Sequence, residues 1–289
     1  MIPRSRRLGI ALVTASALAW STTGLFTRLI PLDAATLLVW RGLFGALGLI
    51  AVLAAFEGSK GLKSFARLGV AGWAYVAISA LGMLCFIAAL RLTSVAHVAI
   101  IYAVVPFLAA ALTWAVLHER PSRDALLASA AAFAGAIVMI GLSRDGGFSG
   151  DLLALGMTLA MAAMMVLARR FPAIPTLPAA ALSALLSAAI ALPFSTAASL
   201  TTTDLALLAA FGLTNSALGL ALFLMGSRLI QPVETALISA LDAPLAPLWV
   251  WLFFAERPGP ATLAGGTIVF AAVLWHIRRS ARPGDHPVG

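Results

Sequence analysis

Asp242 is a carboxylate in the middle of a long apolar stretch, with Pro244 and Pro247 close behind it. A charge inside a bilayer costs roughly 3 kcal/mol or more, so such a residue tends to face a cavity or a partner. Each proline lacks a backbone donor and kinks a helix, which frees carbonyl groups beside the carboxylate. The pattern predicts a polar centre at Asp242 that binds a cationic group or accepts a proton. A protonated or paired carboxyl that only packs between helices is the alternative.

Aromatic, hydroxyl and methionine side chains recur at the spacing of single helix faces, because residues at i, i+4, i+7 and i+11 share a face. Three such faces are Ser16, Trp20, Thr23, Thr27; Tyr75, Ser79, Gly82, Phe86; and Met157, Met161, Met164. Stacking surface beside hydrogen-bonding groups suits an amphipathic ligand, whereas close helix packing or a gap-filling core is the alternative. The candidate substrate-binding residues are Trp20, Thr23, Tyr75, Ser79, His97, Tyr102, Met161, Asn215, Ser239 and Asp242.

Other charged residues are candidates for gating or coupling, namely Asp242, Glu234, Glu119, Arg120, Glu256 and Arg257. Glu234 precedes Asp242 by two helical turns, near the end of the same apolar stretch. The two Glu-Arg pairs stand before Pro121 and Pro258 at the ends of apolar stretches. They are therefore better candidates for ion pairs that close a gate or that end a helix than for ligand contacts. Arg41 is expected to reach outward and pair with Asp33 or with a neighbouring loop, with binding of a substrate carboxylate as the alternative.

The apolar stretches that carry these residues are long enough to cross a membrane. Of the 289 residues, 62% are hydrophobic and 10% are charged, whereas soluble domains are about half apolar and about a quarter charged. A helix needs about 20 residues to cross the hydrocarbon layer. Ten spans are predicted, near 9–30, 35–56, 68–90, 94–117, 124–142, 151–169, 177–194, 204–227, 233–254 and 260–277.

Positive charges are distributed unevenly over the connections between these spans. With the N-terminus inside, the inner side receives most of the Lys and Arg residues, and the outer side receives only Arg28, Arg91, Arg144 and Arg257. This asymmetry follows the positive-inside rule. It predicts a multi-pass membrane protein with cytoplasmic N- and C-termini, and it accounts for the net charge of +8 without a nucleic-acid partner.

The two halves of the sequence repeat. Arg91-Leu92 recurs as Arg228-Leu229, and Glu119-Arg120-Pro121 recurs in the same register as Glu256-Arg257-Pro258. Each half has five spans, and an odd number makes the halves cross the membrane in opposite directions. Inverted repeats are typical of alternating-access carriers, with the ligand near the midplane between the halves. The predicted fold is an all-α integral membrane protein of ten transmembrane helices, as two inverted five-helix repeats around a central cavity.

Trp20-Ser21-Thr22-Thr23, Arg41 and the paired Glu-Arg-Pro helix ends carry a resemblance to a known family. Over essentially the full chain, the sequence resembles the drug/metabolite transporter superfamily in its ten-helix EamA-like branch, and it looks most like the bacterial aromatic amino acid exporters. The resemblance implies that spans 1, 3, 4, 6, 8 and 9 surround the cavity and that spans 5 and 10 pack at its edge. It implies EamA-like repeats at 1–145 and 150–280, followed by a cytoplasmic tail at 281–289.

The repeat and the resemblance together imply an alternating-access secondary transporter that exports small amphipathic metabolites, above all amino acids including aromatic ones, across the inner membrane. An exporter of other metabolites or drugs and a passive channel or scaffold are the alternatives. An enzyme is not expected, because the sequence lacks nucleophile motifs, paired intramembrane aspartates and clusters with metal-ligand spacing. The expected partners are the lipid bilayer and an amino acid-like molecule, with a coupled proton as a further alternative. No cofactor, metal or nucleic acid is expected.

Overall fold

Helices make up the fold. The computed structural model describes residues 4–93, 95–140, 147–196, 200–255 and 257–279, and no strand occurs within these ranges. The α-helices are α1 (Arg4–Ser21), α2 (Thr23–Leu29), α3 (Ala34–Lys63), α4 (Gly69–Leu92), α5 (Val95–Tyr102), α6 (Val105–Leu117), α7 (Arg123–Ile140), α8 (Phe148–Arg170), α9 (Thr176–Ala191), α10 (Thr202–Phe211), α11 (Leu220–Ser227), α12 (Pro232–Ser239), α13 (Asp242–Phe254) and α14 (Pro260–Arg279). Two 3₁₀ segments, η1 (Ser64–Arg67) and η2 (Leu192–Phe194), and the π-helical η3 (Gly212–Gly219) complete the described elements.

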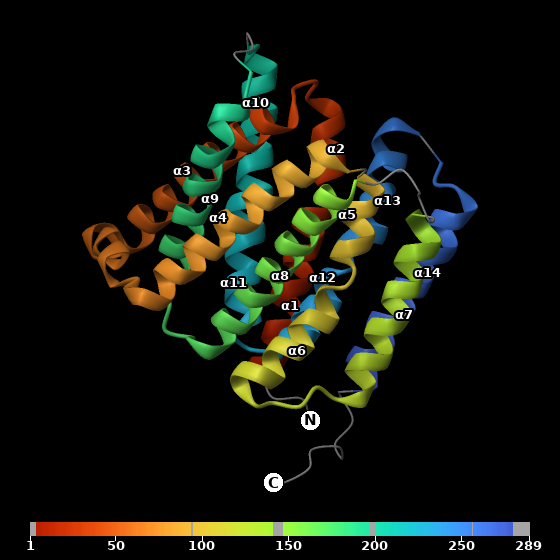
Figure 1. The fold of residues 1–289 in the computed structure, drawn as a ribbon. Coiled ribbons are helices and arrows are strands. Elements are labelled where there is room, and N and C mark those ends of the chain that lie inside the picture. The colour runs from red at the N-terminus through yellow and green to blue at the C-terminus, as the bar shows by residue number, and fades with distance from the viewer. Residues whose placement is uncertain (1–3, 94, 141–146, 197–199, 256, 280–289) are drawn as a thin grey trace.

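These elements confirm the all-α membrane fold expected from the sequence. Nine segments of the described chain are long and apolar enough to cross a membrane, and they correspond to nine of the predicted spans. The remaining predicted span is α7, which has 18 residues and packs along α14 at one edge of the bundle (Figure 1).

The second span continues further than the prediction, which ends it at residue 56. In the structure, α3 runs to Lys63 and is interrupted at Gly58, which has φ 55° and ψ −139°. This backbone conformation is essentially restricted to glycine. The residues after Gly58 therefore form a short helical extension at the end of the span.

Spans four and nine share one interrupted shape. Span four consists of α5 and α6 with a joint at residues 103–104, and span nine consists of α12 and α13 with a joint at 240–241. α6 and α13 each have 13 residues. Each is followed by a residue in the left-handed conformation, His118 with φ 56° and Ala255 with φ 55°. The backbone thus repeats in the same register as the Glu-Arg-Pro sequence, which confirms the internal repeat.

The two halves pack as inverted copies. α1 begins at the end of the bundle where both chain termini lie, here named the terminal side, whereas α8 begins at the opposite end (Figure 1). A Cβ on Gly9 would come within 2.8 Å of Ile230, just after α11, and a Cβ on Gly150 would come within 2.6 Å of Leu92, at the end of α4. α1 and α8 therefore start against corresponding places in opposite halves. Equivalent helices also pair directly, α3 with α9 and α7 with α14.

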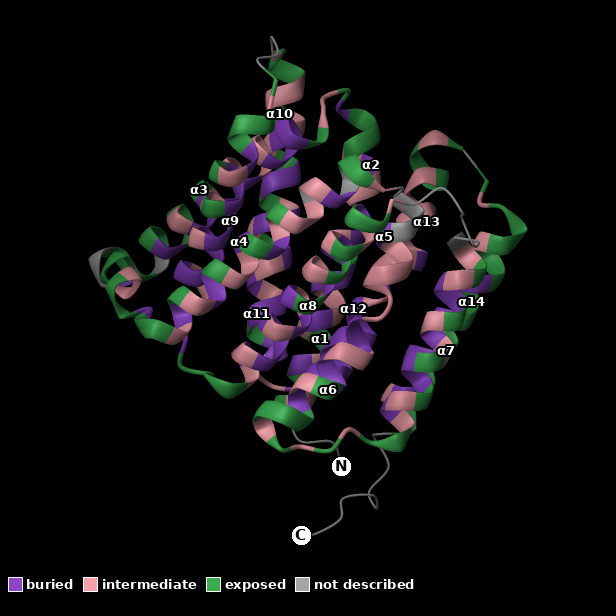
Figure 2. Ribbon diagram, viewed as in Figure 1, coloured by how far each residue is buried: buried purple, intermediate pink, exposed green. Residues whose placement is uncertain are grey.

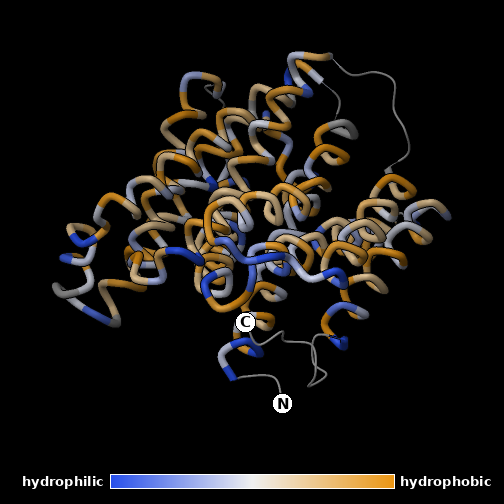
Figure 3. The backbone as a smooth tube through the Cα atoms, turned by 60° about the horizontal axis from the view of Figure 1, so that its bottom comes forward, coloured by the Kyte–Doolittle hydropathy of each residue, from blue (hydrophilic) through white to orange (hydrophobic). Residues whose placement is uncertain are grey.

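Burial and hydropathy agree with a position in lipid. α12 is buried along its whole length, whereas large apolar side chains such as Trp73, Trp114 and Leu252 are exposed. Figure 2 shows buried residues gathered toward the centre of the bundle and exposed residues on the helices around it. Seen from the terminal side, hydrophilic residues gather at helix ends and connections, and the helices between them are mostly apolar (Figure 3). Extensive exposed apolar surface is unusual in water-soluble monomers, so this surface is suited to contact with acyl chains.

Polar contacts hold the terminal side together. Glu234 Oε1 accepts a hydrogen bond from Arg6 Nη2 at 2.6 Å and lies 3.0 Å from His276 Nε2, which links α12 to α1 and α14. Arg228, which follows α11, donates hydrogen bonds to the carbonyl oxygens of Pro172 and Ile174 at 2.6 and 2.8 Å. At this end of the bundle the Arg6–Glu234 contact joins the two repeats, and the Arg228 contacts join two parts of the second repeat.

Candidate functional site

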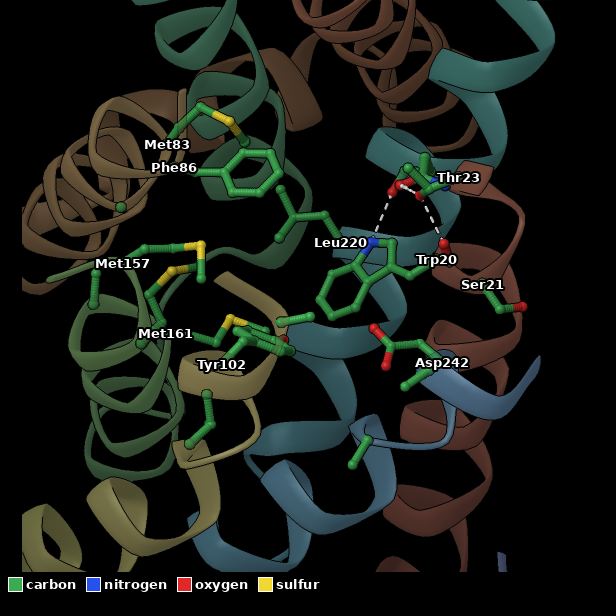
Figure 4. Close-up of a pocket in the computed structure, with 18 of the residues that line it drawn as sticks. Trp20, Ser21, Thr23, Met83, Phe86, Tyr102, Met157, Met161, Leu220 and Asp242 are labelled. Atoms are coloured by element: carbon green, nitrogen blue, oxygen red, sulfur yellow. Dashed lines mark hydrogen bonds between the residues drawn. The ribbon is translucent and has the colours of Figure 1, made fainter. Parts of the chain in front are cut away.

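A cavity of about 500 Å³ lies between the two halves (Figure 4). Its walls include these candidate residues: Trp20, Thr23, Ser79, Tyr102, Met161, Asn215 and Asp242. All six spans that the resemblance places around the cavity contribute to it. The structure adds Arg41 and Gly42 from α3 and Ser183 and Ser187 from α9, together with a few positions on α7 and α14. Spans two and seven therefore form part of the wall, which the resemblance did not imply.

The indole ring of Trp20 is held in place from the opposite half of the chain. Trp20 Nε1 donates a hydrogen bond to the backbone oxygen of Asn215 at 3.1 Å, and the ring packs on Phe223 with centroids 5.0 Å apart. The Asn215 side chain donates through Nδ2 to the carbonyl oxygen of Ala19 at 3.1 Å and accepts a hydrogen bond from Thr23 Oγ1 at 3.3 Å. Because these contacts fix one edge of the indole, its remaining surface is presented to the cavity as a rigid stacking platform.

Asn215 makes these contacts from η3, a π-helical turn in the middle of span eight. A π-helical turn inserts an extra residue into a helix, and such turns frequently occur at functional sites. It changes the direction in which the following side chains and carbonyls point. Here it places both the Asn215 amide and its backbone oxygen toward α1, where they contact Ala19 and Trp20.

Asp242 lies at a helix break inside the membrane. It is the first residue of α13, immediately after the joint at 240–241, and its carboxylate points into the cavity beside Trp20 (Figure 4). Free backbone N–H groups and the helix dipole favour negative charge at a helix N-terminus. Tyr102 lines the same cavity. The break therefore places an acidic group at the end of a half-helix, facing open space.

Sulfur-bearing and aromatic side chains line the cavity opposite Asp242. Met83 and Phe86 come from α4, and Met157 and Met161 come from α8 (Figure 4). Methionine is flexible and polarisable, so it adapts to ligands of different shape. This wall can therefore contact the apolar parts of ligands that differ in shape.

Arg41 differs from the expectation that it reaches outward to Asp33. Asp33 instead caps α3, where its Oδ1 accepts hydrogen bonds from the backbone N–H groups of Ala35 and Thr36 at 3.1 and 3.0 Å. Burial acts to raise the pKa of Asp33, but hydrogen bonds from Thr196 and Thr36 outweigh it and lower the pKa to about 2. With Asp33 occupied in this way, Arg41 is one of the residues that line the cavity, and its guanidinium carbon lies over the Phe211 ring, 5.6 Å from the ring centroid.

Two of the predicted substrate-binding residues that the structure describes, Tyr75 and Ser239, are not among the cavity-lining residues. Tyr75 is fully buried in a cluster with Leu68, Met164 and Leu224, although Ser79, one turn later, does line the cavity. Ser239 is buried in α12 at the last residue before the joint. The side chain of His97 lies outside the described residues.

The predicted gating residues differ in whether they contact other helices in the structure. Glu234 lies on the terminal side in contact with Arg6 and His276. Glu119 and Arg120 are not joined by an ion pair in the part of the chain that the structure describes, and Arg120 is exposed. Arg257 is exposed as well, and Glu256 lies outside the described residues. Among the candidates, Glu234 is therefore the one that links described helices.

Some site residues carried too little signal to be named from the sequence. Ser183 and Ser187 stand four residues apart in an alanine-rich span, a spacing that marks one helix face but that also fits ordinary helix packing. His276 lies in the last turn of the last span, and nothing in its sequence neighbourhood indicates the contact with Glu234. The hydroxyl spacing on span seven was the signal that could have indicated a polar wall.

The chemistry available in the cavity is that of binding. It offers one carboxylate, one guanidinium, several hydroxyl groups and a large apolar surface. Within the described residues, no group of three or more His, Cys, Asp or Glu could hold a metal ion. A small ligand with both polar and apolar parts would find partners on opposite walls.

The comparisons with known proteins agree with this architecture. The model of the EamA-like transporter family matches the chain twice, over residues 7–141 and 148–278. A solved structure titled "Crystal structure of protein" is similar with a TM-score of 0.84 and 18% identity, covering 96% of this chain and 99% of that chain, a likeness that shows the fold alone. No match occurs among curated proteins. Because the family model covers most of both halves, the chain belongs to the EamA-like transporter family and is a membrane transporter of small solutes, not an enzyme.

Proposed function

We propose that the chain is an alternating-access secondary transporter that exports small amphipathic metabolites, foremost amino acids including aromatic ones, across the inner membrane. The observation that carries the proposal is the cavity between the repeats, where the Trp20 ring and the methionine wall lie within reach of the Asp242 carboxylate. An amino acid side chain would occupy the apolar wall, and its ammonium group would face Asp242.

The size of the cavity supports a ligand of this class. Its volume of about 500 Å³ lies within the range of roughly 300–1,000 Å³ that is typical of small-molecule sites. A single aromatic amino acid fits such a space, and the adaptable methionine wall would also accept other amphipathic metabolites. Export of other metabolites or drugs is therefore the second candidate function.

The contacts on the terminal side support alternating access. The cavity includes residues in the first part of α3 and the second part of α4, which are the parts remote from the terminal side. On the terminal side, Glu234 binds Arg6 and His276, and Arg228 binds the chain between α8 and α9. In the proposal these contacts close one side of the carrier and separate when that side opens. Asp242 carries a coupled proton or binds the substrate ammonium.

The proposal places both termini in the cytoplasm. The reason is the excess of Lys and Arg in the sequence on the terminal side, with only a few such residues on the other side. A reporter enzyme that folds only in the cytoplasm, fused after Gly289, should be active. Activity of a reporter that works only outside the membrane would contradict this orientation.

Replacement of Trp20 or Tyr102 by Ala should weaken transport of aromatic substrates. Both rings line the cavity, and loss of an aromatic contact surface should raise KM by roughly tenfold or more. Tyr75→Ala serves as the matched variant, because Tyr75 is buried outside the cavity and should lower thermal stability rather than affinity. Unchanged KM values in both cavity variants would mean that these rings only pack between helices.

The function is tested by transport into proteoliposomes with a panel of radiolabelled compounds. Aromatic and aliphatic amino acids and nucleobases should be compared at equal concentrations. Saturable transport that favours amphipathic amino acids is expected, and selective transport of nucleobases or drugs would favour the second candidate function. Flux that rises linearly with concentration for every compound would favour a passive channel.

A further inference from the structure

Arg41 is a cation without an anionic partner inside a membrane span. It lies seven residues after the start of α3 at Ala34, which is roughly 10 Å along the helix at 1.5 Å per residue. Arg41 Nε is buried without a hydrogen-bond partner, and no ion pair joins Arg41 to another residue in the described part of the chain. A buried guanidinium normally has carboxylates or carbonyls around its five donors. Arg41 is instead among the residues that line the cavity.

The position of Arg41 is fixed by close contact of its backbone with the second half. A Cβ on Gly212 would come within 2.6 Å of the Arg41 carbonyl oxygen, and a Cβ on Gly42 would come within 2.6 Å of the Ala184 carbonyl oxygen. α3 therefore fits tightly between η3 and α9 at this level. The Phe211 ring, 5.6 Å from the guanidinium carbon, supports one face of the group. A ring face provides no hydrogen-bond acceptor in the guanidinium plane, so the donors stay available.

Ser183 supplies a second polar group on the same wall. It is fully buried, its hydroxyl oxygen has no hydrogen-bond partner among the residues that the structure describes, and it is among the residues that line the cavity. Ser183 directly precedes Ala184, the residue that α3 contacts at Gly42. A buried polar group without a partner costs stability. Two such groups at one helix crossing, both beside the same cavity, indicate a ligand that supplies the missing acceptors.

We infer that Arg41 and Ser183 form a subsite for the carboxylate of the substrate. An anionic group would neutralise the guanidinium and accept hydrogen bonds from it and from the Ser183 hydroxyl. With Asp242 facing the same cavity, the two charges define a substrate that carries a carboxylate and an ammonium group, together with an apolar part for the methionine wall. The inference rests on the proposed function for the choice of a carboxylate among anions, and it assigns the specificity for that group to Arg41.

The subsite is tested by binding of two probes that differ only in charge. Binding of 3-phenylpropionate and of its neutral analogue 3-phenylpropionamide to the purified full-length protein is measured by isothermal calorimetry. The wild-type protein should bind the carboxylate at least about tenfold more tightly, since hydrogen bonds to charged groups are worth that much. Equal binding of the two probes, or binding of neither, would overturn the inference.

Variants test which residues produce the preference for the carboxylate probe. Arg41→Gln should remove the preference for the carboxylate while leaving amide binding in place, Ser183→Ala should reduce the preference, and Arg41→Lys should retain part of it. Arg91→Gln is the matched control, because Arg91 also lies over a phenylalanine ring, Phe194, but is exposed and does not line the cavity. A carboxylate preference that survives in Arg41→Gln would contradict the assignment. The comparison of the two probes on wild-type protein stays decisive even if a variant folds poorly.

Transport separates failure of this inference from failure of the proposed function. Wild-type proteoliposomes should exchange phenylalanine faster than phenethylamine, which lacks the carboxylate, and Arg41→Gln should lose this difference. Phenylalanine transport with an unchanged KM in Arg41→Gln would leave the proposed function intact and reject the carboxylate subsite. Absence of amino acid transport by the wild type, with the carboxylate preference still present in binding, would reject the function and retain the subsite.

Discussion

Asp242→Asn is expected to give folded protein whose transport is reduced by roughly tenfold or more and no longer changes with pH. The substitution keeps the shape of the side chain and its hydrogen bonding but removes the charge and most of its ability to accept a proton. A hydrogen bond or ion pair to a charged group contributes roughly 1.5–3 kcal/mol, which corresponds to about tenfold or more in affinity. Since the carboxylate points into the cavity, its loss should act on the substrate or the coupled proton and not on packing.

The internal repeat supports a functional rather than a structural role for Asp242. The equivalent first residue of α6 is Val105, which cannot ionise. Packing demands should be similar at these two helix breaks, because α6 and α13 have the same length and the same left-handed ending. A binding or coupling group, in contrast, is needed only once.

The measurement for Asp242→Asn is the rate of amino acid transport in proteoliposomes across a series of pH values. Asp204→Asn is the matched control, because Asp204 is a half-buried capping residue in the first turn of α10 and does not line the cavity. It should transport at the wild-type rate. Wild-type transport with an unchanged pH profile in Asp242→Asn would contradict both ammonium binding and proton coupling at this residue.

Gly45→Val is expected to remove most of the folded protein. Gly45 lies on α3 where this helix meets η3, and an added Cβ would come within 2.3 Å of Ser216 Cβ and 2.8 Å of the Gly212 carbonyl oxygen. A backbone atom cannot move aside as a flexible side chain does. Overpacking typically costs roughly 1–3 kcal/mol, and the cost should be larger here because two helices would have to separate. The same contact holds Arg41 and Asn215 at the cavity, so any folded remainder should bind substrate poorly.

The effect of Gly45→Val is measured as the yield of monodisperse protein in detergent and as its thermal stability. Gly259→Val is the matched control, since a Cβ at Gly259 would meet nothing within 4 Å. The control should keep the wild-type yield and melting temperature. Equal yields of the two variants would show that α3 and η3 do not depend on close backbone contact.

The membrane fold follows from strong signals in the sequence. Long apolar runs separated by polar residues predict the spans, and most helices begin and end close to the predicted positions. The repeat was visible because a Glu-Arg-Pro triplet recurs in register, and the structure shows why that register matters. The triplets follow the left-handed residues His118 and Ala255, which end α6 and α13.

Features inside the spans were harder to predict, because hydropathy reports burial in lipid and not the path of the backbone. The joints at 103–104 and 240–241 and the π-helical η3 occur inside segments that are apolar enough to cross a membrane. Prolines indicated a kink in span nine, but the break falls before Pro244. Only a three-dimensional arrangement shows which half-helix starts at the cavity.

Helical spacing predicted which residues share a helix face, but not whether each of them lies in the core or at the cavity. Tyr75 and Ser79 share a face, yet the structure buries Tyr75 in the core and places Ser79 at the cavity. Arg41 was expected to reach water, as long basic side chains near helix ends commonly do. Asp33, the expected partner of Arg41, instead accepts hydrogen bonds from the hydroxyl groups of Thr36 and Thr196, which belong to opposite halves of the chain.

Counterflow of a radiolabelled aromatic amino acid is the most direct test of the proposed carrier. Proteoliposomes are loaded with a high concentration of unlabelled phenylalanine and diluted into a trace of labelled phenylalanine without any ion gradient. A carrier that alternates its cavity between the two sides should accumulate the label transiently above its equilibrium level, and should not do so when the vesicles are loaded with buffer alone. Simple equilibration of the label at the same rate with either loading would contradict the account.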